Sequence, residues 1–110
     1  MKDHRQFLRK ALHCTVSVFD EQHNNLGVMA DYSDGGIMLS SYQAIEVDKK
    51  FKLTIIDLPG NSGHKRSGHI EVLSVWSDKV NTSQFGTGFK LIKCDENAKL
   101  MFQSYDNSQN

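Results

Sequence analysis

Short segments that alternate apolar and polar residues recur along this chain, with turn-forming residues between them. Alternation with a period of two places successive side chains on opposite faces of a β-strand. Short strands at regular spacing predict a small antiparallel barrel or sandwich. The uneven alternation of the fifth segment also predicts a β-bulge or strong twist there. The six predicted strands occupy residues 14–19, 26–33, 37–41, 51–58, 69–76 and 86–93.

The period changes near the C-terminus. Within residues 95–105, Ala98, Met101, Phe102 and Tyr105 recur at the spacing of one helix face, and Asp95 is a suitable N-cap. The predicted fold class is therefore all-β with a C-terminal helix, whose apolar face covers one barrel opening or edge. We expect residues 1–12 to form a flexible arm, 13–105 the barrel with its helix, and 106–110 a disordered tail.

The composition excludes several functions for a single domain of 110 residues. The formal net charge is zero, whereas a general nucleic-acid binder is usually basic. The longest apolar runs are too short to insert into a membrane, and the charged N-terminus lacks the apolar core of a signal peptide. We therefore expect a cytoplasmic protein, with Cys14 and Cys94 as reduced thiols.

Candidates for catalysis are weak. The five histidines have no metal-binding spacing, and His64 and His69 flank a predicted loop, where solvated side chains are the simpler interpretation. Both cysteines lie in strand-like apolar segments, where thiols are usually inert. Residues 85–89 lack the lysine and following helix of a phosphate-binding loop. The sequence thus predicts neither an enzyme nor a metal site.

Two of the three arginines, Arg5 and Arg9, lie four residues apart near the N-terminus of a chain that otherwise uses ten lysines. Arginine differs from lysine in its planar fork, which bonds phosphate or a guanine edge bidentately and stacks on flat rings. The same pair could instead belong to a solvated arm and pair with nearby carboxylates. The spacing alone does not choose between the two.

A second polar segment, DYSDGG, occupies residues 31–36. As a hairpin turn it needs only Asp34 and the two glycines, because Gly35 and Gly36 tolerate positive φ. Asp31 and Ser33 alternate along the incoming strand, so both side chains point the same way. A carboxylate beside a hydroxyl suits the edge of a purine, because it accepts from N1–H and N2–H of guanine.

Together, RxxxR (Arg5, Arg9) followed by DxSxxG (Asp31, Ser33, Gly36) resembles the PilZ domain family. The later strands, with Gly86, Gly88 and Phe89, and the terminal helix resemble the same family, so the resemblance spans most of the chain. The resemblance implies a six-stranded antiparallel β-barrel that binds cyclic di-GMP and has no cofactor. The ligand-binding residues that it implies are Arg5, Arg9, Asp31, Ser33, Gly35, Gly36 and Gly88.

The resemblance also implies roles. The two arginines would fork onto phosphates and guanine edges, Asp31 and Ser33 would bond a guanine edge, and the arm would close over the ligand. The output would pass to an unidentified effector protein in motility, pilus or exopolysaccharide regulation, from a monomer or a homodimer. One alternative is a protein–protein adaptor of the same fold that binds no nucleotide. A barrel for single-stranded nucleic acid is the other, and residues 49–52 (KKFK) are its one candidate stretch.

Overall fold

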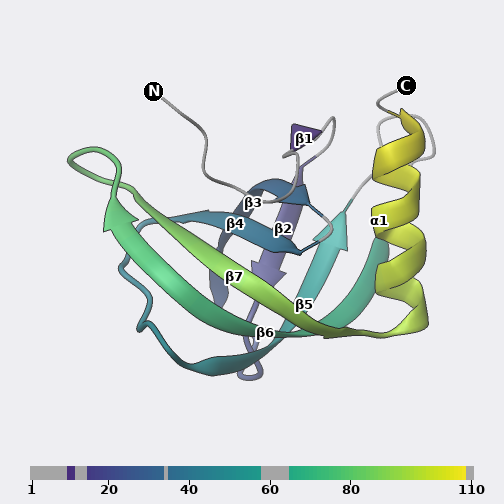
Figure 1. Cartoon of the computed structure of the whole chain (residues 1–110), viewed down its shortest axis with the longest axis horizontal. Coiled ribbons are helices and arrows are strands. Elements are labelled where there is room, and N and C mark those ends of the chain that lie inside the picture. The colour runs from purple at the N-terminus through teal and green to yellow at the C-terminus, as the bar shows by residue number, and fades with distance from the viewer. Residues whose placement is uncertain (1–9, 12–14, 34, 58–64, 109–110) are drawn as a thin grey trace.

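The computed structural model describes residues 10–11, 15–33, 35–57 and 65–108. In these ranges the chain forms seven strands followed by one helix (Figure 1). The elements are β1 (Lys10–Ala11), β2 (Val16–Phe19), β3 (Asn25–Ser33), β4 (Gly36–Ser41), β5 (Lys50–Asp57), β6 (Arg66–Lys79), β7 (Phe85–Cys94) and α1 (Glu96–Ser108).

Six of the strands close into a barrel. They are paired in the order β3-β2-β5-β6-β7-β4, every pairing is antiparallel, and β4 returns to pair with β3. Closure leaves these six strands without a free sheet edge over most of their length, which limits pairing with other chains. The predicted fold class, a six-stranded antiparallel barrel with a C-terminal helix, is confirmed.

The fifth predicted strand begins earlier than expected. β6 starts at Arg66, three residues before the predicted start of this strand at residue 69. Arg66, Ser67 and Gly68 pair with the last residues of β5, so the ladder extends through them. The register of β6 against β7 shifts at two places, between Glu71 and Val72 and between Ser74 and Trp76, as the uneven alternation predicted.

The predicted flexible arm contains a short strand. Lys10 pairs with Tyr32 and Ala11 with Asp31, which forms β1 on the edge of β3. β2 covers β3 only between residues 25 and 28, so the later part of that edge is available to another strand. The rest of the arm, residues 1–9 and 12, lies outside the described residues.

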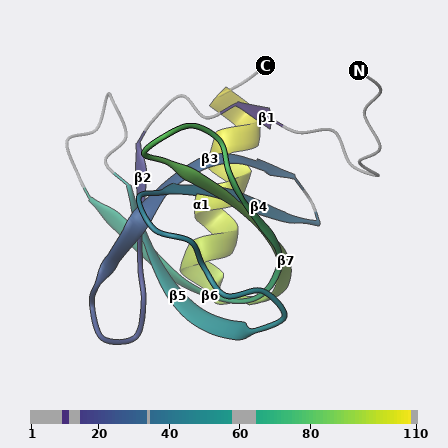
Figure 2. The same ribbon diagram turned by 90° about the vertical axis from the view of Figure 1, so that its left-hand side faces the viewer.

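Helix α1 stands at one end of the barrel, and from the opposite side it lies behind the ring of strands (Figures 1 and 2). Ala98, Met101 and Tyr105 are buried as the helical spacing predicted, and Phe102 is half-buried. The Asp95 carboxylate accepts from the N–H of Ala98 at 2.8 Å, which confirms the predicted N-cap.

The helix continues to Ser108, so its last three residues lie in the segment that the sequence predicted as a disordered tail. Each residue added to an anchored helix gains a backbone hydrogen bond, so the helix can continue beyond the buried Tyr105. Residues 109–110 lie outside the described residues. No helix in the described part of the chain is long and apolar enough to span a bilayer.

A buried polar cluster fastens α1 to the barrel. The Asp57 side chain is 1% exposed and accepts from Arg66 Nε at 3.0 Å and Arg66 Nη2 at 2.7 Å. The Tyr105 hydroxyl donates to the same carboxylate at 2.5 Å. The guanidinium also lies 5.8 Å from the centroid of the Tyr105 ring. A buried carboxylate is tolerated because its oxygens are bonded by a cation and a hydroxyl.

Candidate functional site

A β-bulge decides which way the predicted binding side chains of β3 face. Met29 pairs with Leu39 and Asp31 with Met38, so Ala30 is an extra residue in the strand. Met29 is buried, Ala30 is exposed, and Tyr32 is buried. Asp31 and Ser33 are half-buried on either side of Tyr32, and both therefore lie on the outer face.

Two rows of paired residues cross the outer face of the barrel from this point. In the first row Asp31 pairs with Met38, Met38 with Gly88, and Gly88 with Trp76. Directly paired residues in a sheet point to the same face. The first row therefore brings Asp31 and Gly88, which the resemblance implies as ligand residues, onto one surface.

The second row runs beside the first. Ser33 pairs with Gly36, and Gly36 pairs with Lys90. Lys90 is exposed and adds a cation to the face that holds Asp31. The sequence interpretation did not include Lys90 or Trp76 among the site residues, because Lys90 comes to lie beside Gly36, and Trp76 beside Gly88, only through pairing between strands.

The glycines of this face have packing roles that the sequence did not predict. A Cβ at Gly36 would overlap the carbonyl oxygen of Phe89, because β4 and β7 approach closely there. A Cβ at Gly88 would overlap the indole ring of Trp76. The carbonyl of Gly35 accepts from the N–H of Leu91 at 3.1 Å.

The expectation that Gly36 supplies a positive φ for the turn is not what the structure shows. Gly36 is the first residue of β4, and the glycine with a positive φ in the described ranges is Gly27, at 146°. The close approach of the strands explains the glycine at position 36. Asp34, the first turn residue, lies outside the described residues.

The two arginines of the predicted motif, Arg5 and Arg9, lie outside the described residues. β1 nevertheless begins immediately after Arg9, and its pairing with Tyr32 and Asp31 lays the chain against the outer row. Lys10 and Ala11 therefore lie on the edge of the barrel beside Tyr32 and Asp31.

Tyr32 connects this part of β3 to the helix. Its ring centroid lies 5.8 Å from that of Phe102 and 5.7 Å from that of Tyr105. Asp31 and Ser33 thus flank a side chain that is packed against α1, on the opposite face of the same strand. A sequence pattern could indicate that Tyr32 is buried, but not that the helix covers it.

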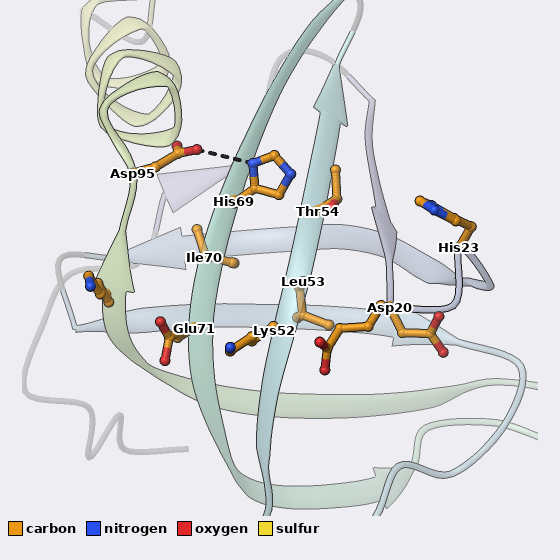
Figure 3. A pocket seen from close by; sticks show the side chains of 11 residues that line it. Asp20, His23, Lys52, Leu53, Thr54, His69, Ile70, Glu71 and Asp95 are labelled. Atoms are coloured by element: carbon orange, nitrogen blue, oxygen red, sulfur yellow. Dashed lines mark hydrogen bonds and ion pairs between the residues drawn. The ribbon is translucent and has the colours of Figure 1, made fainter.

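A separate hollow of about 420 Å³ lies over β5 and β6 (Figure 3). It contains none of the predicted ligand residues. Its polar lining includes Asp20, Lys52, His69, Glu71 and Asp95. In the figure the His69 ring and the Asp95 carboxylate point toward one another, and Nδ1 lies 3.1 Å from Oδ2.

The carboxylates best placed in this hollow already have partners in the chain. Asp20 accepts from the N–H of Asn24 and of Gln22, both at 2.9 Å, and the bond from Asn24 is the main cause that lowers the pKa of Asp20. The N-cap bond to Ala98 likewise lowers the pKa of Asp95. No three His, Cys, Asp or Glu side chains gather as a metal site within the ranges that the structure covers. We therefore assign the hollow no ligand.

Comparisons with known proteins found a matching family model and solved structures of similar fold. The PilZ domain model matches residues 3–105. The structure of the Bacillus subtilis inhibitor of motility (MotI/DgrA) has a TM-score of 0.68 at 14% identity, over 98% of this chain and 52% of that one. This chain therefore spans about half the length of that protein.

A second similar structure is the PilZ domain of YcgR from Escherichia coli with c-di-GMP. Its TM-score is 0.59 at 13% identity, and the match covers 83% of this chain and 79% of that one. At these identities the two structures establish the fold. No curated protein sequence matches this chain.

Proposed function

This chain belongs to the PilZ domain family, and on that premise we propose that it is a non-catalytic receptor for cyclic di-GMP. The observation that carries the proposal is the outer face of β3, β4 and β7, where Asp31, Ser33, Gly36 and Gly88 share two adjacent rows. The PilZ domain of YcgR, which is similar in fold, was determined with this ligand.

The chemistry of that face suits a guanine nucleotide. The Asp31 carboxylate accepts from N1–H and N2–H of guanine, and the Ser33 hydroxyl bonds the same edge. Gly36 adds no side chain to this face, and Gly88 leaves room for the indole of Trp76 against the sheet. The ligand is a dianion, and Arg5 and Arg9 neutralise it with bidentate forks that also stack on its bases.

Binding is converted into a signal by the N-terminal arm. β1 anchors the arm beside Asp31, and Arg5 and Arg9 close over the ligand from that anchor. Ordering of a segment by a bound anion is a common switching mechanism. We propose that the closed arm contacts an effector protein in the cytoplasm, in motility, pilus or exopolysaccharide regulation. The motility inhibitor among the similar structures favours the first of these.

Isothermal titration with cyclic di-GMP tests the proposal, with GTP and cyclic GMP as competing ligands. We expect saturable binding of the cyclic dinucleotide alone. Asp31→Ala, Arg5→Ala and Arg9→Ala should each lower the affinity by about tenfold or more, because each removes a charge-assisted hydrogen bond. Glu71→Gln and Lys93→Ala are matched controls, because both residues line the hollow over β5 and β6.

The emission of Trp76, the single tryptophan of the chain, gives a second readout, because it ends the row that begins at Asp31. If wild-type protein shows neither heat nor an emission change with cyclic di-GMP, the receptor proposal fails. The adaptor interpretation would then take its place.

A further inference from the structure

A groove of about 250 Å³ begins at Ser33 and runs between β7 and the helix. It therefore shares one residue with the outer face proposed to bind cyclic di-GMP. Beyond Ser33 and the largely buried Tyr32, its lining comes from two elements that the DxSxxG pattern does not include, β7 and α1. They contribute Leu91, Cys94, Lys99, Phe102 and Gln103.

The groove has apolar walls and a polar rim. Leu91, Cys94 and Phe102 are half-buried and form the walls, while Lys99 and Gln103 are exposed. Lys99 and Gln103 are four residues apart on α1, so they lie on one face of the helix. The positive charge of Lys99 acts on the Cys94 thiol, although burial is the larger effect and raises its pKa. Lys99 and Cys94 line the same groove, so the cation lies close to the apolar wall.

An apolar slot with a cation and an amide on its rim has the features of a purine site. The faces of a base pack against Leu91 and Phe102. Guanine presents O6 and N7 as acceptors on one edge, and a lysine ammonium or an amide N–H donates to them. The volume suits one base rather than a whole dinucleotide, because sites for complete drug-sized ligands are usually about 300–1,000 Å³.

We propose that one guanine of the cyclic dinucleotide enters this groove and is bonded by Lys99 and Gln103, while Asp31 bonds the other. This inference rests on the proposed function. Two observations support it. The groove is continuous with the outer face of β3, because Ser33 belongs to both surfaces, and the positive charge of Lys99 attracts an anionic ligand. Helix α1 then becomes part of the binding site, so a base bound in the groove contacts the helix that covers one end of the barrel.

Titration of cyclic di-GMP into Lys99→Met and Gln103→Ala tests the groove. We expect Lys99→Met to weaken binding about five- to tenfold and Gln103→Ala about threefold, as the loss of one hydrogen bond each implies. Lys93→Met is the matched control, because it removes the same charge from an exposed position that lines a different hollow. Its affinity should stay within about twofold of wild type. Met and Ala are good helix formers, so α1 should be retained.

Alkylation of Cys94 gives an independent readout. Iodoacetamide should modify Cys94 more slowly when cyclic di-GMP is saturating. The extent of modification is measured by mass spectrometry of the peptide that contains Cys94. Mildly alkaline buffer favours the reaction, because burial raises the pKa of this thiol.

The outcomes separate the two proposals. If wild-type protein binds no cyclic di-GMP, both are overturned. If it binds and Asp31→Ala abolishes binding, while Lys99→Met behaves like Lys93→Met and Cys94 is not protected, only the groove is overturned. Weakened binding in Lys99→Met together with protection of Cys94 establishes it.

Discussion

Removal of the Tyr105 hydroxyl isolates the contribution of the polar cluster that fastens α1 to the barrel. In Tyr105→Phe the ring keeps its edge contact with Tyr32, at 5.7 Å between centroids, and its place beside the Arg66 guanidinium. The substitution removes the donor to Asp57. A hydrogen bond to a charged group contributes about 1.5–3 kcal/mol. We expect the lower part of that range, ~1.5–2 kcal/mol, because Asp57 keeps both bonds from Arg66.

For a domain of this size that loss corresponds to a fall in Tm of about 6–8 °C, measured by differential scanning calorimetry or circular dichroism. Tyr42→Phe is the matched control, because its side chain is 77% exposed, and its Tm should not change measurably. Arg66→Met should cost more, about 3–5 kcal/mol, because it leaves the buried carboxylate of Asp57 without its cation. Equal melting temperatures for Tyr105→Phe and Tyr42→Phe would refute the conclusion that the polar cluster around Asp57 holds the helix on the barrel.

Two further predictions concern the start of the helix. The N–H of Ala98 lowers the pKa of Asp95 below its ordinary 3.8, so its carboxylate contributes stability above about pH 4 that is lost as the pH falls through the folded pKa. Asn caps helices without a charge, so calorimetry of Asp95→Asn should show a smaller fall in Tm between pH 5 and pH 2 than wild type, and an identical fall would contradict this. Gly68→Ala should cost about 1–3 kcal/mol in chemical denaturation, because its Cβ would lie 2.6 Å from the backbone nitrogen of Ala98. Unchanged stability would mean that the helix does not rest on Gly68.

The sequence predicted the six barrel strands and the helix because each carries its own period. Residues 14–19 alternate, residues 86–93 begin with two glycines ahead of apolar residues, and the helix face is set by Ala98, Met101 and Tyr105. Long-range pairing sets the features that the sequence missed. β6 starts at Arg66 because that residue pairs with Asp57 nine residues earlier, and no local pattern distinguishes those residues from loop.

The short strand of the arm and the end of the terminal helix also depend on contacts that a local sequence pattern does not contain. Lys10 and Ala11 form a strand only because β2 leaves part of the edge of β3 uncovered, a consequence of register. Residues 106–108 remain helical because the helix that precedes them is anchored to the barrel. Both segments were predicted as irregular from their polarity. Polarity indicates the preference of a segment on its own, but not whether a neighbouring element will pair with it or anchor it.

The candidate site shows how far a local pattern can reach. Alternation predicts that Asp31 and Ser33 share a face, since they are two positions apart in a strand. It does not predict which face. Counted from the buried Met29 without interruption, Asp31 would point into the barrel, where an unpartnered carboxylate is costly. The extra residue, Ala30, reverses the count and turns both side chains outward. Deletion of Ala30 would restore uninterrupted alternation from Met29, so Asp31 and Ser33 should stay on the outer face, whereas entry of Ala30 into the ladder would turn both of them inward.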